Sequence, residues 1–123
     1  MKKHILVIDD ETIVTQVLAK LLTRCSYKVT IALDDQQGID IFRADPPDLV
    51  IVDIFMPGVD GIEVIRTLKN ENSPARFIAI SEGAMRGEAD RLPEAQQVGA
   101  EYALTKSPDN KEFLEAIETL LGF

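Results

Sequence analysis

The chain has 123 residues, the length of one domain, and 46% of them are hydrophobic, which is enough for a core of that size. Its 21 acidic and 13 basic residues give a net charge of −8, which argues against nucleic acid or an anionic membrane surface as a partner. The single cysteine, Cys25, excludes an intramolecular disulfide and favours a reducing, cytoplasmic location. We see no apolar stretch suited to a signal peptide or a membrane span.

Apolar runs and amphipathic stretches alternate along the whole chain. In chain order, the sequence predicts a strand at 4–8, a helix at about 12–24, a strand at 29–32, a helix at about 34–44, a strand at 48–52, a turn at 57–61, a helix from 62 that ends before 73, a strand at 77–80, a long loop at 82–91, a short helix at about 92–98, a strand at 102–105 and a last helix whose apolar stripe runs from 113 to 121. Asp109 and Glu112 have the spacing of a capping box for that last helix.

This alternation predicts one α/β domain over residues 1–123. Five strands separated by helices favour a parallel sheet with helices on both faces. Right-handed crossovers leave few topologies, and one of them is the flavodoxin-like order 2-1-3-4-5. In that order, ligands bind in the crevice between the carboxyl ends of the first and third strands.

Five polar residues lie where the expected strands end. Asp9 and Asp10 follow the first strand, Asp53 follows the third, Ser81 follows the fourth and Lys106 follows the fifth. Since the carboxyl ends of parallel strands share one edge of a sheet, we expect all five side chains to meet in one pocket.

The residue types in this pocket indicate phosphoryl chemistry. Three nearby carboxylates repel one another, and oxygen ligands without His or Cys suit Mg²⁺. Asp53 is the candidate nucleophile because carboxylates form aspartyl-phosphates. The Ser81 hydroxyl is suited to donate to a phosphoryl oxygen, and Lys106 supplies a positive charge for phosphate. These three residues are therefore the candidate catalytic group.

The same residues carry a family resemblance. The sequence resembles the receiver domain of two-component response regulators in Asp9-Asp10-Glu11, Asp53-x-x-Met56-Pro57-x-x-Asp60-Gly61, Ile80-Ser81 and Leu104-Thr105-Lys106. The resemblance implies Mg²⁺ bound by Asp9 or Asp10, by Asp53 and by the backbone carbonyl of Phe55. It implies that a sensor histidine kinase or a histidine phosphotransfer protein phosphorylates Asp53.

The resemblance also sets expectations for the whole chain. It implies a stand-alone receiver of the chemotaxis type, without an output domain, whose phosphorylation switches its contacts with a downstream protein that the sequence does not identify. We expect a monomer or a weak dimer, no nucleic-acid or membrane partner, and no enzymatic turnover beyond self-catalysed phosphoryl acceptance and hydrolysis.

Four positions depart from the family pattern. Ser107 follows Lys106 where proline is usual, and Ala103 stands where an aromatic residue often moves on activation. Glu82 adds a carboxylate after Ser81, and Phe55 stands two residues after the acceptor, where it is placed to shield an acyl phosphate from water. An alternative is therefore a degenerate receiver, a constitutive interaction module that works without phosphorylation.

Two further readings are weaker. A Mg²⁺-dependent phosphatase with an aspartyl nucleophile usually carries a second aspartate two residues later, where this chain has Phe55. A flavodoxin-like cofactor binder needs a phosphate-binding loop after the first strand, where Asp9, Asp10 and Glu11 repel an anion.

Overall fold

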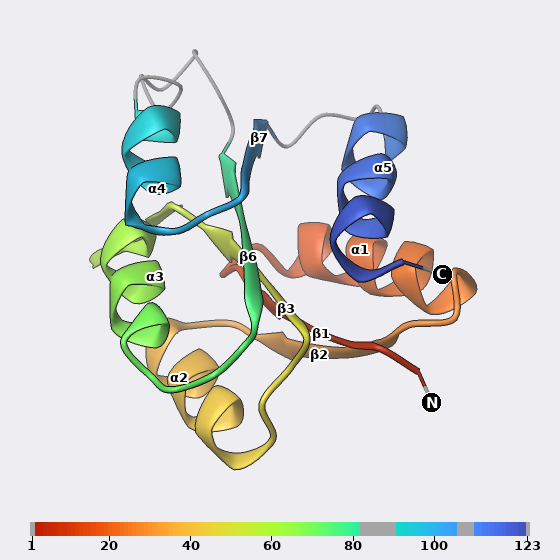
Figure 1. The fold of residues 1–123 in the computed structure, drawn as a ribbon, viewed down its shortest axis with the longest axis horizontal. Coiled ribbons are helices and arrows are strands. Elements are labelled where there is room, and N and C mark those ends of the chain that lie inside the picture. The colour runs from red at the N-terminus through yellow and green to blue at the C-terminus, as the bar shows by residue number, and fades with distance from the viewer. Residues whose placement is uncertain (1, 82–90, 106–109, 123) are drawn as a thin grey trace.

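The fold is one parallel sheet with helices on both faces (Figure 1). The computed structural model describes residues 2–81, 91–105 and 110–122. In chain order the elements are β1 (His4–Ile8), α1 (Thr12–Arg24), β2 (Lys28–Ala32), α2 (Asp35–Ala44), β3 (Leu49–Asp53), β4 (Phe55–Met56), β5 (Val59–Asp60), α3 (Gly61–Lys69), β6 (Arg76–Ser81), α4 (Leu92–Val98), β7 (Tyr102–Thr105) and α5 (Asn110–Leu121).

The order of the strands confirms the predicted topology. The sheet runs β2-β1-β3-β6-β7, and each neighbouring pair is parallel. Counted along the sheet's own strands, this is the flavodoxin-like order 2-1-3-4-5. β1 lies directly beside β3, with Ile8 opposite Val52, so the residues that follow these two strands come together at one edge.

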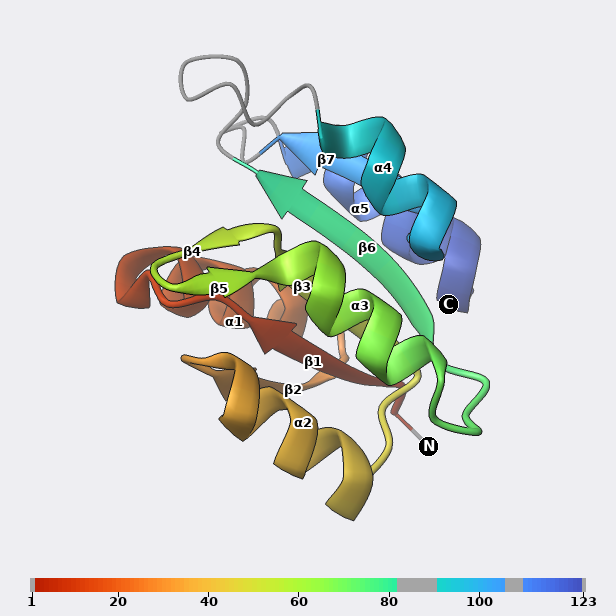
Figure 2. The same cartoon turned by 90° about the vertical axis from the view of Figure 1, so that its left-hand side faces the viewer.

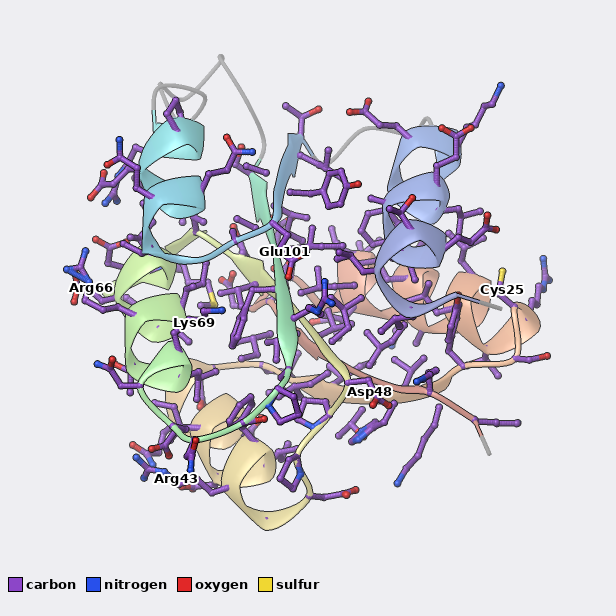
Figure 3. All side chains as sticks on the ribbon, viewed as in Figure 1. Cys25, Arg43, Asp48, Arg66, Lys69 and Glu101 are labelled. Atoms are coloured by element: carbon purple, nitrogen blue, oxygen red, sulfur yellow. The ribbon has the colours of Figure 1, made fainter. Side chains whose placement is uncertain are left out.

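The sheet is buried on both faces, which explains why its strands are continuous apolar runs. Ile5 and Val7 face a core layer shared with α1 and α5, whereas Leu6 and Ile8 face a layer shared with α2, α3 and α4. Figure 1 shows this division, with α1 and α5 on one side of the sheet and the other three helices on the opposite side. Charged side chains such as Arg43 and Arg66 point outward from α2 and α3 (Figure 3).

The structure explains an unfavourable residue in α2. Gly38 is buried, and a Cβ atom at this position would lie 2.5 Å from the Cδ1 atom of Ile8. A side chain here would displace the side chain of Ile8, so glycine fits where the helix crosses β1. Asp34 begins the helix as its N-cap and accepts a hydrogen bond of 2.7 Å from the backbone N–H of Gln37, as the predicted helix start requires.

Three details differ from the sequence-based expectations. β3 is shifted by one residue and includes Asp53. The expected turn at 57–61 is part of a small antiparallel hairpin, in which β4 pairs with β5. On α1 the apolar stripe is wider than the buried face, because Ile13 and Val17 are exposed. Among the described helices, none has both the length and the apolarity that crossing a membrane requires.

Several expectations concern residues outside the described ranges. These are the loop at 82–90, including Glu82, and the residues Lys106, Ser107 and Asp109 with the predicted capping box.

Candidate functional site

Three carboxylates converge at the carboxyl edge of the sheet. Asp9 and Asp10 follow β1, and Asp53 ends the neighbouring strand β3. One carboxylate oxygen from each residue lies within 4.8 Å of the other two. Figure 2 shows the ends of β1 and β3 next to the hairpin formed by β4 and β5. The predicted convergence of these three side chains is therefore present.

Backbone amides orient the two buried carboxylates of this cluster. The N–H of Glu11 donates to Oδ1 of Asp9 at 3.0 Å, and the N–H of Phe55 donates to Oδ1 of Asp53 at 3.0 Å. In both cases the donor lies two residues after the aspartate, the geometry of an Asx turn. Each turn fixes a carboxylate of which at most 1% is exposed, while Asp10 is partly exposed at the mouth of the site.

Ser81 ends the next strand of the sheet, on the side of β3 away from β1. Asp53 is in register with Ile80, and the N–H of Ile54 donates to the carbonyl of Ile80 at 3.0 Å. Ser81 is fully buried, and its Oγ makes no hydrogen bond within the described residues. Its hydroxyl is thus a donor held on the strand beside β3. Lys106, the other predicted catalytic residue, lies outside the described ranges.

The segment after Asp53 is held against this residue by the start of α3. A Cβ atom on Gly61 would lie 2.2 Å from the backbone carbonyl oxygen of Asp53, so only glycine allows this approach. Asp60 caps the helix by accepting from the N–H of Ile62 at 3.0 Å. Phe55 lies in this segment with its side chain 48% exposed, and its role as a metal ligand stays a prediction.

The donor set of the cluster fits a hard divalent cation. It consists of carboxylate oxygens without His or Cys, which favours Mg²⁺ over transition metals. A cation there also offsets the repulsion among three like charges, two of them on buried side chains.

Apart from Phe55, sequence reasoning missed the exposed apolar residues that lie close to this site along the chain. Ile13, Val17, Leu33 and Phe55 are the exposed large hydrophobic residues of the described chain. Ile13 and Val17 lie on α1, Leu33 directly follows β2, and Phe55 lies in β4, two residues after Asp53. The spacing of Ile13 and Val17, one helical turn apart and close behind the two aspartates, was the available signal.

Comparison with known proteins agrees with this geometry. A family model of the response regulator receiver domain matches residues 5–118. The chain belongs to this receiver domain family. The phosphotransferase F of sporulation initiation from Bacillus subtilis is 30% identical over 98% of the chain and 95% of its own length. The polar-differentiation response regulator DivK of Brucella anthropi is 27% identical over 99% of the chain and 98% of its own length.

Other receiver relatives are longer proteins. The probable transcriptional regulator ycf27 of Cyanophora paradoxa is 32% identical over 98% of the chain, which spans 48% of that protein. The chain spans 27% of the response regulator PleD of Caulobacter vibrioides, with 31% identity. Similarity to these proteins therefore concerns their receiver domains.

Solved structures show the same fold. The response regulator TrrA of Thermotoga maritima, in complex with Mg²⁺ and BeF, has a TM-score of 0.85 with 29% identity and covers 98% of this chain and 100% of its own. The chemotaxis protein CheY4 of Vibrio cholerae has a TM-score of 0.88 at 20% identity, over 98% of this chain and 100% of its own, and supports the fold alone.

One departure from the family pattern has a structural counterpart. Tyr102 packs with the core layer of α1 and α5, whereas Ala103 packs with the layer of α2, α3 and α4. The aromatic ring therefore belongs to the face of the sheet opposite the one at which receivers often carry a mobile aromatic residue. Tyr102 and Ala103 thus face opposite sides of the sheet, as successive residues of a strand do.

Proposed function

We propose that this receiver domain accepts a phosphoryl group on Asp53 from a phosphohistidine of a sensor histidine kinase or a histidine phosphotransfer protein. The observation that carries the proposal is the convergence of Asp9, Asp10 and Asp53 within 4.8 Å at the carboxyl edge. A buried aspartate beside two others is suited to bind a cation and to act as a nucleophile.

The proposed reaction is a direct transfer. A carboxylate oxygen of Asp53 attacks phosphorus, the P–N bond of the phosphohistidine breaks, and the imidazole nitrogen keeps the electron pair. Dephosphorylation follows when water attacks phosphorus and the P–O bond to Asp53 breaks, which releases inorganic phosphate. The chain is thus a substrate and a switch in this proposal, and does not turn over a separate substrate.

The other site residues prepare Asp53 for this transfer. We assign Asp9, Asp10, Asp53 and the carbonyl of Phe55 as the groups that hold Mg²⁺. When bound, Mg²⁺ supplies positive charge that neutralises the phosphoryl oxygens. We assign the Ser81 hydroxyl as a hydrogen-bond donor to the phosphoryl group and Lys106 as its ion-pair partner, as the family resemblance implies.

The exposed apolar residues close to the site support a protein as the phosphodonor. Ile13 is 78% exposed and Val17 is 54% exposed, and both lie in the first half of α1, which begins two residues after Asp10. Exposed apolar side chains next to a reactive site mark a surface that another protein covers. We propose that a helix carrying the phosphohistidine packs on this face of α1.

The proposal extends to the setting of the protein. An exposed free thiol at Cys25 supports the reducing cytoplasm as the compartment. We propose that the chain works as a single receiver domain, as a monomer or weak dimer, and that phosphorylation switches its binding to a protein target.

Intact mass spectrometry tests the proposal. Wild-type protein and Asp53→Asn are incubated with acetyl phosphate, with Mg²⁺ or with EDTA. We expect the mass of one phosphoryl group to be added only to wild type and only with Mg²⁺. Addition to neither protein would overturn the proposal and favour the alternative of a constitutive interaction module. Glu82→Ala and Ser107→Pro would then be the variants to test for recovered phosphorylation.

A further inference from the structure

An arginine at the start of α4 holds the segment that follows the acceptor. Arg91 donates from Nη1 to Oδ1 of Asp60 at 3.2 Å and from Nη2 to Oδ2 at 3.0 Å. This is a two-pronged ion pair, the strongest geometry for a guanidinium and a carboxylate. The side chains are only 30% and 37% exposed, so water screens the pair less than an ordinary surface contact.

Asp60 connects this arginine to the acceptor site. Besides its bonds to Arg91, its Oδ1 caps α3 by accepting from Ile62. Asp60 also pairs with Phe55 in the β4–β5 hairpin. The N–H of Phe55 in turn donates to Oδ1 of Asp53. Four residues thus form a continuous path from the side chain of Arg91 to the acceptor carboxylate.

Arg91 is equally important for its own helix. α4 has only seven residues, and its N-cap position is Arg91, whose side chain makes no capping hydrogen bond. The arginine instead reaches Asp60 and, at 3.3 Å from its Nε, Glu94 in the first turn of the helix. Short helices depend on tertiary contacts for their stability, so the contact with Asp60 helps to fix where α4 begins.

We propose that the Arg91–Asp60 ion pair couples the start of α4 to the geometry of the acceptor site, and that Arg91 is a positioning residue for the chemistry at Asp53. The inference rests on the proposed function, because it concerns regulation of the same site. It connects two residues that are 31 positions apart in sequence and lie in different elements.

The coupling has a direct thermodynamic consequence. If the pair holds the hairpin in the arrangement that binds a phosphoryl group, its loss lowers the fraction of molecules in that arrangement. The apparent affinity for a phosphoryl analogue then falls by the same fraction. A partly exposed ion pair is expected to change that affinity about threefold. Lysine keeps the charge but lacks the two-pronged geometry, so Arg91→Lys is expected to bind the analogue more weakly than wild type and more tightly than Arg91→Gln.

The chain contains a matched control at the other end of the sheet. Arg76 begins β6, and its Nη1 donates to both carboxylate oxygens of Glu101, at 3.0 Å and 2.8 Å. Glu101 lies between α4 and β7 (Figure 3). Arg76→Gln therefore removes an arginine–carboxylate pair whose glutamate is as exposed as Asp60, although its arginine is more exposed than Arg91, without touching the hairpin or the acceptor.

The test is a calorimetric titration with beryllofluoride, a mimic of the phosphoryl group, in the presence of Mg²⁺. It uses wild type, Arg91→Gln, Arg91→Lys, Asp60→Asn, the double variant Arg91→Gln/Asp60→Asn, and Arg76→Gln. Asparagine at position 60 keeps an oxygen that caps α3 but loses the charge. The amide resonance of Phe55 in a ¹⁵N-correlated NMR spectrum is recorded for each protein before the titration.

We expect Arg91→Gln and Asp60→Asn to weaken binding by a similar factor, about threefold. The double variant should be no weaker than either single one, because both changes remove the same contact. The Phe55 amide should shift in these variants and stay unchanged in Arg76→Gln. Wild-type affinity in Arg91→Gln, or an equal loss in Arg76→Gln, would overturn the inference while leaving the proposed function in place.

Failure of the proposed function gives a different result. In that case wild type binds no beryllofluoride, and the inference about regulation falls with it. Should Arg91→Gln unfold, Arg91→Lys and Asp60→Asn decide the question: their comparison with wild type either shows the partial loss and the Phe55 shift or contradicts the coupling.

Discussion

The two ends of the sheet differ in how their polar side chains are paired. At the amino end, polar groups have matched partners. The ring Nε2 of His4 lies 2.8 Å from Oγ1 of Thr30, and its backbone N–H donates to Asp48 at 2.8 Å. Lys28 pairs with Asp45 at 3.1 Å. The contacts of His4 satisfy partly buried polar groups, and the pair of Lys28 and Asp45 lies at the exposed surface of this end.

At the carboxyl end, groups of the same charge are brought together. Asp9, Asp10 and Asp53 place carboxylate oxygens within 4.8 Å, and the buried Ser81 hydroxyl lies on the next strand. Apolar residues such as Ile13 border this end and are exposed to solvent. Each of these features costs stability in isolation, and proteins keep such features where they bind or react. This difference indicates that the amino end stabilises the fold and that the carboxyl end is the candidate functional site.

The largest expected effect comes from Gly61 at the carboxyl end. In Gly61→Ala the new methyl group would lie 2.2 Å from the backbone carbonyl oxygen of Asp53, so α3 and β3 must move apart. We expect a loss of about 3 kcal/mol in the free energy of unfolding and slower phosphorylation. Urea unfolding and the rate of acetyl phosphate labelling measure the two effects.

Gly58→Ala is the matched control. Gly58 has a positive φ of 70°, but a Cβ atom there meets nothing within 4 Å. We expect only the backbone penalty of about 1 kcal/mol and a labelling rate like that of wild type. Equal effects of both substitutions on labelling would contradict a special role for the contact between Gly61 and Asp53.

Removing one charge from the carboxylate cluster should change the response of the protein to Mg²⁺, whereas a similar change at the amino end should not. Asp10→Asn leaves two carboxylates, and we expect the affinity for Mg²⁺ to fall roughly tenfold or more. Without Mg²⁺ the variant should be somewhat more stable than wild type, because one repulsion is removed. Thermal unfolding over a series of Mg²⁺ concentrations measures both effects.

Asp45→Asn is the corresponding change at the amino end. It removes the partner of Lys28 and leaves the carboxylate cluster intact. Its response to Mg²⁺ should equal that of wild type. If Mg²⁺ stabilises Asp10→Asn as strongly as the other two proteins, the cluster is not the metal site.

The exposed face of α1 predicts an effect that depends on the phosphodonor. In Ile13→Ser we expect transfer from a phosphorylated histidine phosphotransfer protein to slow about fivefold, since an interface contact is lost. Labelling by acetyl phosphate should not change, because that donor needs no docking surface. The free energy of unfolding should change by no more than about 0.5 kcal/mol, as expected for an exposed position. Equal slowing with both donors would place the effect at the chemical site and contradict docking on α1.

The smallest expected effect is a pH dependence at the amino end. Burial lowers the pKa of His4 below its ordinary value of 6.5, with Lys28 acting in the same direction and Asp45 and Asp48 opposing it. Between the lowered pKa and 6.5 the unfolded chain binds more protons, so stability falls as the pH drops below about 6.5. In His4→Gln this part of the pH dependence should disappear in urea unfolding curves. If the free energy of unfolding of His4→Gln depends on pH as steeply as that of wild type, other groups cause this pH dependence.

The sequence predicts the parts of this molecule that depend on local patterns. Continuous apolar runs identify the strands of a two-sided sheet, and their alternation with helices leaves few topologies. Once the order of the strands is known, Asp9, Asp53 and Ser81 must lie at one edge. Asp34, at the start of the predicted helix at about 34–44, is of a residue type that commonly caps helices.

Other features depend on contacts that no local pattern reveals. Ile13 has the spacing of a core residue, and only the position of α1 on the sheet shows that it is exposed. The ion pair between Arg91 and Asp60 joins residues 31 positions apart. Gly38 is unfavourable for a helix by residue type, and only the structure shows that it lies close to the side chain of Ile8.

The most direct test of the central claim is to identify the phosphorylated residue chemically. Borohydride reduces an aspartyl phosphate to homoserine, which peptide sequencing by mass spectrometry locates. After incubation with acetyl phosphate and Mg²⁺, we predict homoserine at position 53 and at neither position 9 nor position 10, with none formed in EDTA. Homoserine at position 9 or 10, or none with Mg²⁺ present, would contradict Asp53 as the acceptor of the carboxyl edge.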